Sequence, residues 1–174
     1  DDDEALTFTV DTAPPAEPDI PHTDKPLTNE PRPTWTWPAV ADAVWYHVFL
    51  GKVGTGAIFD EKIDADPESM PSWRPSAEVP GDLLDGIYYL QVTAIDALGN
   101  ESTRSGAGYV EIDATKPAPP VMKALPRYTG STSVTFEWWP VPDAVGYDFS
   151  YQIDDGAWQE PEDGKGLTNP TYTV

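Results

Sequence analysis

Two stretches of this chain read almost alike, WTWPAVADAVWY at residues 35–46 and FEWWPVPDAVGY at residues 136–147. Trp37 aligns with Trp138 at a spacing of 101 positions, and the Asp-Ala-Val triplet that follows is the same in both copies. A match of this length within one chain is the signature of an internal repeat. The conserved Trp and the changing residues around it predict packing positions that both copies share.

A second pair of stretches repeats at nearly the same spacing. Residues 8–18 read FTVDTAPPAEP and residues 110–120 read VEIDATKPAPP, which aligns Asp11 with Asp113 at 102 positions. The difference of one position between the two spacings indicates a single insertion or deletion between the blocks. The Pro-rich parts of both stretches cannot lie within a central β-ladder, because proline has no N–H donor. They are predicted to be stiff linkers between modules.

The repeat length predicts how the chain is divided. About 100 residues is the size of one β-sandwich domain. We therefore expect residues 1–12 to be the last strand of a preceding module, residues 13–114 a complete module, and residues 115–174 the N-terminal part of a second one. Nothing in the second copy matches Leu84–Ile112. The expected fold class is all-β, with tandem antiparallel β-sandwich modules of which the second is incomplete.

Period-2 alternation predicts the strands and their faces. Trp35 and Trp37 share one face of a strand, and Phe136 with Trp138 repeats that face. In the next strand Tyr46, Val48 and Leu50 point inward and their partners are Tyr147, Phe149 and Tyr151, while in a later strand the inward residues are Tyr88, Leu90, Val92 and Ala94. Asp155-Gly156 predicts a hairpin, with Trp158 starting the returning strand.

These residues resemble fibronectin type III domains of the bacterial kind, which are also described as immunoglobulin-like. VTFEWWPVPDAVGYDFSYQIDDGAW, from Val134, looks like the second and third strands of that family, and LLDGIYYLQVTAIDALGNES, from Leu83, looks like its sixth strand and following loop. The resemblance implies that Tyr88 is the corner tyrosine, whose hydroxyl bonds to a nearby backbone group. It also implies a role as a spacer, stalk, adhesion array or accessory domain of a polysaccharide-degrading enzyme.

Composition excludes several kinds of partner and site. The net charge is −20, so the chain repels nucleic acid and anionic lipid. There is no cysteine, which rules out disulfides, thiolate metal sites and cysteine nucleophiles. No stretch is long and apolar enough for a transmembrane helix, and no signal peptide opens the chain. The first residues read like the interior of a longer protein, and we expect an extracellular or cell-surface protein of bacterial origin.

Enzymatic activity is not expected. His22 and His47 lie on different predicted elements, and His47 is on the outward face of its strand. The sequence holds no nucleophile elbow, phosphate-binding loop or dinucleotide fingerprint. No cofactor is expected, with calcium as the one exception.

The acidic composition has two interpretations. The carboxylates serve solubility, or some of them hold Ca²⁺ where modules meet. In this topology Asp11 would approach Asp42 and Asp96, and Asp113 would approach Asp143, with Asp82 or Asp85 nearby. Like charges this close repel unless a cation bridges them. The Asp-x-Asp-x-Asp-Gly ligand loop is absent, however, and aspartate is common in turns for its own reasons.

Four aromatic residues are candidates for ligand contact. By the predicted register Trp45, Trp73, Tyr89 and Trp139 lie on outward faces or in loops. Such rings stack on sugars or pack against partner proteins, or they cover a neighbouring module. The partners we expect are neighbouring modules, a cell-surface protein or a polysaccharide.

The function expected from the sequence is that of a structural spacer or adhesive segment in a large secreted or cell-surface protein. The alternative is a non-catalytic, carbohydrate-binding accessory region of a secreted polysaccharide-degrading enzyme. The unmatched ends have two explanations as well: the chain is part of a longer one, or strands are exchanged between chains. The first is the simpler.

Overall fold

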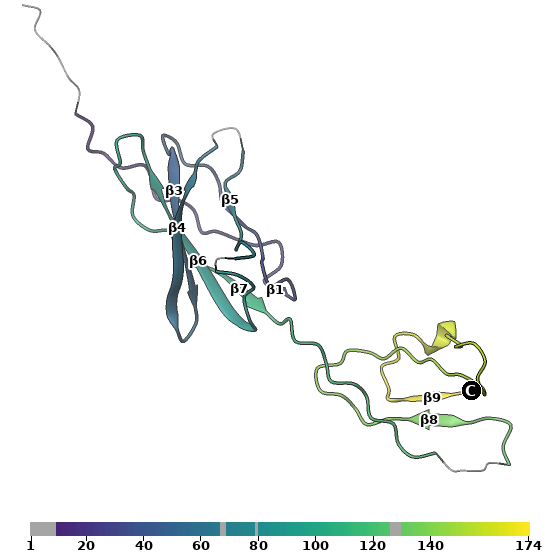
Figure 1. Ribbon diagram of the computed structural model, residues 1–174. Coiled ribbons are helices and arrows are strands. Elements are labelled where there is room, and N and C mark those ends of the chain that lie inside the picture. The colour runs from purple at the N-terminus through teal and green to yellow at the C-terminus, as the bar shows by residue number, and fades with distance from the viewer. Residues whose placement is uncertain (1–9, 67–68, 79, 126–129) are drawn as a thin grey trace, which may run out of the picture. The chain divides into compact units, whose positions relative to one another are not determined.

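The computed structural model describes residues 10–66, 69–78, 80–125 and 130–174, and it divides into two compact units, Asp1–Thr115 and Lys116–Val174 (Figure 1). Each unit has its own strands and its own buried residues, so each is described by itself. The predicted strand over residues 1–12 lies mostly outside the described residues.

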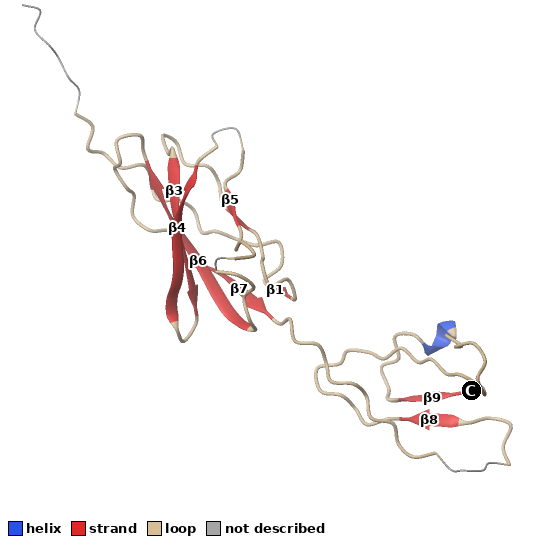
Figure 2. Cartoon of the chain, in the orientation of Figure 1, coloured by secondary structure: helices blue, strands red, loops and turns tan. Residues whose placement is uncertain are grey.

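The N-terminal unit is built from two sheets whose strands, apart from β1, pair in antiparallel fashion (Figure 2). A five-stranded sheet has the order β1-β7-β6-β3-β4, and a two-stranded sheet pairs β2 with β5. Its bounds are β1 Leu27–Thr28, β2 Trp35–Thr36, β3 Trp45–Lys52, β4 Gly56–Asp64, β5 Ser72–Trp73, β6 Gly86–Ile95 and β7 Gly108–Ile112. The described residues contain no α-helix, and the all-β prediction is confirmed.

Strand β3 lies between β4 and β6 in the larger sheet. Val48 pairs with Glu61 of β4 and with Val92 of β6, and Leu50 pairs with Leu90 in the same register. Because side chains alternate along each strand, this register brings the inward residues of β3 and β6 to one face. The parallel pairing of β1 with β7 completes the sheet.

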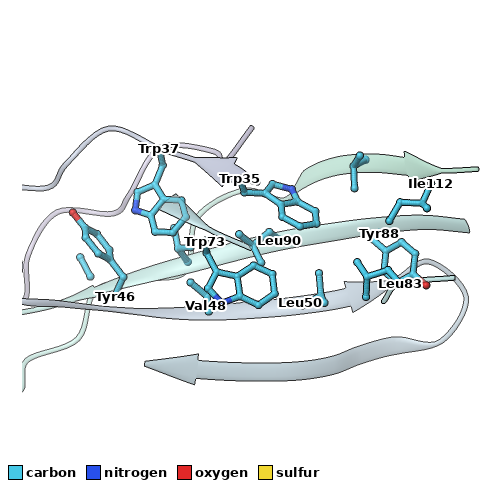
Figure 3. Packing of buried hydrophobic residues seen from close by; sticks show 13 residues of the cluster. Trp35, Trp37, Tyr46, Val48, Leu50, Trp73, Leu83, Tyr88, Leu90 and Ile112 are labelled. Atoms are coloured by element: carbon cyan, nitrogen blue, oxygen red, sulfur yellow. The ribbon is translucent and has the colours of Figure 1, made fainter. Parts of the chain in front are cut away.

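The core lies between the two sheets, where indole and phenol rings pack against the aliphatic residues of β3 and β6 (Figure 3). Trp35 and Trp37 are fully buried, which confirms that they share the inward face. The Trp37 and Tyr46 rings meet edge to face, with centroids 5.4 Å apart. The predicted inward residues of the two long strands are all buried: Tyr46, Val48, Leu50, Tyr88, Leu90, Val92 and Ala94.

Tyr88 occupies the corner position expected from the family resemblance. Its hydroxyl donates to the carbonyl of Leu84, with an O···O distance of 2.8 Å. This bond ties the start of β6 to the segment that leads into it. The prediction for Tyr88 is confirmed.

The C-terminal unit repeats the first part of this arrangement. Strand β8, Thr135–Glu137, pairs with β9, Thr171–Thr173, and a 3-10 turn, η1, spans Glu162–Gly164. The Phe136–Tyr172 pair corresponds to the Trp35–Trp73 pair of the first unit.

Trp37 and Trp138 occupy the same environment in their respective units. Trp138 is buried and meets Tyr147 edge to face at 5.3 Å, as Trp37 meets Tyr46. The same hydrogen bond accompanies both pairs: the amide of Val40 donates to the Tyr46 hydroxyl at 2.8 Å, and Val141 donates to Tyr147 at 2.9 Å. The packing inferred from the repeat is present in both copies.

The hairpin predicted at Asp155-Gly156 differs in detail. The chain does reverse, since Tyr151 bridges Gln159 in antiparallel fashion and the Gly156 amide donates to the Ile153 carbonyl at 3.1 Å. The residue with positive φ is Asp154, at 47°, rather than either residue of the predicted pair. Aspartate tolerates this conformation, so the turn forms one position earlier than the Asp-Gly signal suggests.

Candidate functional site

Three of the predicted calcium ligands lie around one hollow in the N-terminal unit. Asp11, Asp42 and Asp96 line a cavity of about 680 Å³ with the Ala-Pro segment that follows Asp11. In the part of the chain that the structure describes, no group of three or more acidic or histidine side chains is placed to hold a metal ion. The carboxylates are therefore neighbours around a hollow rather than a converging ligand set, and calcium binding stays a prediction.

The carboxylate of Asp96 organises the loop after β6. One oxygen, Oδ1, accepts from the amides of Leu98 and Asn100, both at 2.8 Å, and Oδ2 accepts from the Asn100 side chain at 2.8 Å. The hydrogen bond from the Asn100 side chain is the main cause of a lowered Asp96 pKa. The side-chain nitrogen of Asn100 also donates to the backbone carbonyl of Asp11 at 3.1 Å, so this loop holds the incoming segment.

Asp42 and Asp143 share a backbone role in their two units. Their φ angles are 65° and 64°, in the left-handed region. The turn is closed by the amide of Ala43, which donates to Val40 at 3.3 Å, and Ala144 donates to Val141 in the same way. A short polar side chain tolerates this φ best after glycine, which explains why the repeat keeps aspartate here.

Asp113 and Asp143 belong to different units. Asp113 lines a small hollow beside Lys25 and Leu27, whereas Asp143 lines a larger one in the C-terminal unit. Asp85 lies close to the chain just beyond Asp113. Its carboxylate accepts from the Thr115 hydroxyl and, at 2.7 Å, from the Ala114 amide.

The hydrogen bond from the Thr115 hydroxyl is the main cause of a lowered Asp85 pKa, and the bond from the Ala114 amide adds to it. Its visible role is to hold the end of the N-terminal unit. Asp82 instead pairs with Arg32 at 3.1 Å.

The outward position predicted for one of the four contact aromatics, Trp73, is wrong. Trp73 is 5% exposed and belongs to the core, where it packs on Trp35 with ring centroids 5.9 Å apart. Its indole nitrogen donates to the Glu61 carboxylate. The sequence around Trp73 has no alternation to reveal this, because the strand that buries it is only two residues long. Burial follows from the pairing of β5 with β2.

The other three predicted aromatics keep outward positions. Trp45, at the start of β3, is 36% exposed, and Trp139 in the C-terminal unit is 60% exposed. Tyr89 points away from the core and its ring covers Gly51 of β3, where a Cβ atom would lie 2.1 Å from the ring. Tyr89 also packs against Tyr109 of β7, with centroids 6.0 Å apart.

The side of the five-stranded sheet opposite the core therefore carries a row of rings, which we call the outer face and define by Trp45, Phe49, Tyr89 and Tyr109. Phe49 is flanked by two polar side chains: its ring lies 4.1 Å from that of His47, and the Arg104 guanidinium lies 3.5 Å above it. The alternation that turns Val48 and Leu50 inward also turns Phe49 to this side, but it does not predict the guanidinium, which comes from the loop after β6.

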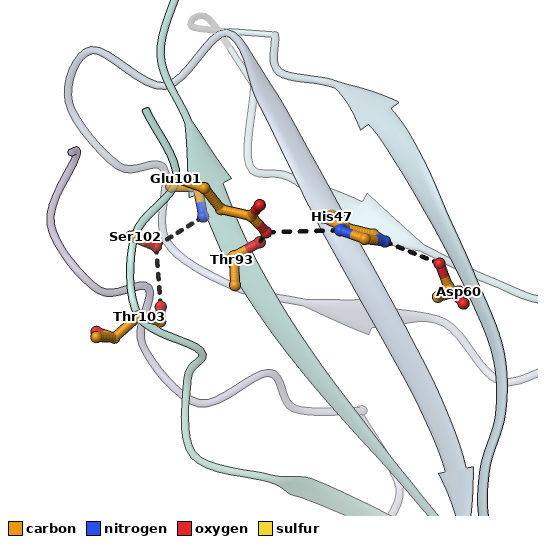
Figure 4. A network of polar contacts seen from close by, with 7 residues as sticks. His47, Asp60, Thr93, Glu101, Ser102 and Thr103 are labelled. Carbon is orange, nitrogen blue, oxygen red and sulfur yellow. Dashed lines mark hydrogen bonds and ion pairs between the residues drawn. The ribbon is translucent and has the colours of Figure 1, made fainter. Parts of the chain in front are cut away.

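His47 is part of a polar network on the same face (Figure 4). Its Nε2 lies 2.9 Å from the Asp60 carboxylate on β4, and its Nδ1 lies 3.5 Å from Glu101. Glu101 also accepts from the Thr93 hydroxyl. The histidine thus links β4 to the loop after β6, as an outward strand residue can.

No protein-family model and no curated protein matches this sequence. Solved structures do resemble it, and two of them serve as examples. The FN1–FN3 domains of chicken CNTN1 are 15% identical over 98% of this chain and 58% of that one, with a TM-score of 0.46. The structure of a 1.5-MDa bacterial ice-binding adhesin, described for its retention on the host cell surface, is 13% identical over 94% of this chain and 54% of that one, with a TM-score of 0.53.

This chain spans less than two thirds of the length of either structure. At such low identity the likeness to the adhesin concerns the fold alone. The fold is all-β. In the N-terminal unit, the larger sheet presents the outer face and the loop at Asp96 holds the incoming segment. No helix among the described residues is long and apolar enough to cross a membrane.

Proposed function

We propose that this chain is a structural spacer or adhesive segment of a large extracellular, multi-module protein, and that it acts without catalysis. The observation that carries the proposal is the repetition of one packing unit. The Trp–Tyr pair and its amide-to-hydroxyl bond recur in two units, each with its own buried residues. Modules that bury their cores internally can be added in series, so that reach increases with their number.

The ends of the N-terminal unit support a mechanical role. The incoming segment is held at Asp11 by Asn100, and the outgoing segment is held at Ala114 and Thr115 by Asp85. A pulling force on the chain would therefore enter and leave the unit through segments bonded to its loops. The strand β7 that precedes the exit is hydrogen-bonded to both β6 and β1.

Single-molecule force spectroscopy tests the spacer function. The chain of residues 1–174 would be pulled between two marker domains of known unfolding length. We expect one discrete event of roughly 30 nm for the N-terminal unit, since an extended residue spans about 3.4 Å. Extension of this unit without a resolved force peak would count against a load-bearing spacer.

The outer face favours a second candidate, an accessory region that binds polysaccharide. Tyr109 is 57% exposed and lies beside Tyr89, and Trp45 lies on the same side of the sheet. Exposed rings on a flat sheet can stack on sugar rings. The test is retention of residues 1–174 on insoluble cellulose and chitin. Binding that is lost in Tyr109→Ala and kept in Trp139→Ala would support this function, and no retention by the unaltered chain would remove it.

Calcium remains a separate proposal for the hollow at Asp11, Asp42 and Asp96. Any ion there would have to compete for the Asp96 oxygens with the Leu98 and Asn100 donors. Isothermal titration of residues 1–174 with Ca²⁺ is the direct test. A saturable heat that disappears in Asp42→Asn would support a site in this hollow, and the absence of heat would remove it.

A further inference from the structure

Strand β4 forms one edge of the larger sheet of the N-terminal unit. The sheet order places β3 on one side of β4, and among the described residues no strand lies on the other side. Most residues of β4 are exposed, and only Phe59 and Ile63 are half-buried. A long, exposed edge strand can accept a further strand through main-chain hydrogen bonds.

The register shows which way the backbone of each β3 residue faces. On β6 the carbonyl groups of Val92 and Ala94 accept hydrogen bonds from the segment that follows β6, at 2.8 and 2.9 Å. Thr93, between them, therefore faces β3, where it pairs with His47. Because this direction alternates along a strand, the backbone groups of Val48 face the opposite way, toward β4.

The same alternation identifies the free backbone groups of β4. Val48 pairs with Glu61, so the backbone groups of Glu61 are used within the sheet. Those of its two neighbours, Asp60 and Lys62, point away from β3. A strand that adds to this edge would therefore bond to Asp60 and Lys62.

The side chains along this edge complement a second copy of the same strand. If two β4 strands pair antiparallel about Glu61, Asp60 of each lies opposite Lys62 of the other, and Phe59 of each lies opposite Ile63. Directly opposed side chains of opposite charge stabilise a sheet, and so do apolar pairs. Since Asp60 and Lys62 carry the outward backbone groups, each of these pairs can also exchange both N–H···O bonds.

Other antiparallel registers complement each other less well. A two-fold axis at Asp60 or at Lys62 sets that residue against its own charge. An axis at Ile63 overlaps only Lys62–Asp64 within the strand. An axis at Phe59 places the register shift between β3 and β4 close to the centre of the contact. The axis at Glu61 is therefore the one that pairs opposite charges over most of the strand.

The unfavourable element of this register is Glu61 itself, which faces its own copy across the axis. Its carboxylate accepts a hydrogen bond from the indole nitrogen of Trp73. Trp73 is buried in the core, so this bond draws the Glu61 charge away from the strand edge. The repulsion between the two Glu61 side chains is reduced but still present, and it weakens the association.

We propose that the N-terminal unit self-associates: β4 of one chain pairs antiparallel with β4 of a second copy about Glu61, which joins the two larger sheets. This contact between chains is independent of the spacer function. The net charge of −20 on each chain opposes association. At about 0.15 M salt, however, charges more than about 8 Å apart are largely screened, so the close Asp60–Lys62 pairs dominate.

Three variants of the full chain test the charge pattern. Lys62→Asp sets like charges opposite each other in both cross-strand pairs. Asp60→Lys combined with Lys62→Asp exchanges the two charges and restores complementarity in the same register, and it also places a carboxylate across from His47. Glu61→Gln removes the repulsion on the axis and keeps an oxygen that can accept from Trp73.

Sedimentation velocity measures the dimer dissociation constant, and amide hydrogen exchange at Lys62 shows whether β4 is the contact. Exchange at Thr93, which lies inside the sheet, reports whether the unit is folded. We expect weak dimers of the parent chain, with a dissociation constant below about 1 mM, and slower Lys62 exchange as the protein concentration rises. Lys62→Asp should weaken dimerisation by at least about tenfold, the double variant should recover it to within about threefold, and Glu61→Gln should tighten it by about two- to fivefold.

The proposal is overturned if the parent chain and Glu61→Gln both stay monomeric at about 1 mM. It is overturned as well by dimers in which the Lys62 amide exchanges as fast as in the monomer, because the contact would then lie elsewhere. A folded double variant that associates no better than Lys62→Asp alone would contradict the register. If a charge variant fails to fold, the parent and Glu61→Gln still give the decision.

Discussion

The paired tyrosines Tyr46 and Tyr147 give the sharpest test of the repeated packing. Each hydroxyl accepts a hydrogen bond from a backbone amide, from Val40 at 2.8 Å and from Val141 at 2.9 Å. Replacing either tyrosine by phenylalanine removes the acceptor and keeps the ring that packs on tryptophan. The two variants therefore change one interaction in two surroundings.

The two surroundings predict different costs. Tyr46 is almost fully buried and Val40 is half-buried, so Tyr46→Phe leaves an amide that water reaches poorly. An unsatisfied amide costs about 1–3 kcal/mol, and partial exposure places this case near 1–2 kcal/mol. Tyr147 is half-buried beside the open hollow, where water can replace the hydroxyl. We expect Tyr147→Phe to cost about 0.5 kcal/mol or less.

Urea unfolding of residues 1–174 measures the free energies, and amide exchange at Val92 separates the N-terminal unit from the other. Tyr89→Phe is the matched control, because Tyr89 lies on the outer face and a surface change there is expected to cost less than about 0.5 kcal/mol. The reasoning is refuted if Tyr46→Phe is no more destabilising than Tyr89→Phe, or if Tyr147→Phe costs as much as Tyr46→Phe.

Three further predictions concern the N-terminal unit. Gly108→Ala should destabilise it by more than about 3 kcal/mol in urea unfolding, since the added Cβ would lie 1.7 Å from the carbonyl oxygen of Pro21, and unchanged stability would contradict this contact. Asp42→Asn should be nearly neutral while Asp42→Val costs about 1–2 kcal/mol, because φ is positive there, and equal melting temperatures would contradict the strain. The Asp96 pKa is lowered on folding, so its stabilisation is present above about pH 4 and is lost as the pH falls through the folded pKa. Asp96→Asn should therefore be less stable than the parent at pH 7, with a difference that shrinks as the pH falls below about 4, and a pH-independent difference would refute this linkage.

Residues whose position depends on nearby sequence could be placed correctly, whereas residues positioned by distant segments could not. Trp37 and Trp138 could be placed from the sequence because a strand exposes its residues alternately and the repeat shows the same face twice. Tyr88 could be placed from the family resemblance. Trp73 could not, because its burial depends on a two-residue strand paired with a segment far along the chain. The position of the Arg104 guanidinium above Phe49 could not be predicted either, since a loop with no periodicity carries it there.

The all-β class, the repeat and the inward faces of the long strands could be predicted from the order of residues, because alternation and self-similarity are properties of the chain read in order. Folding was needed to show which aspartates surround one hollow and which rings share the outer face. Those features depend on the register between segments up to a hundred positions apart, and register is fixed only when the sheets pair and the core between them closes.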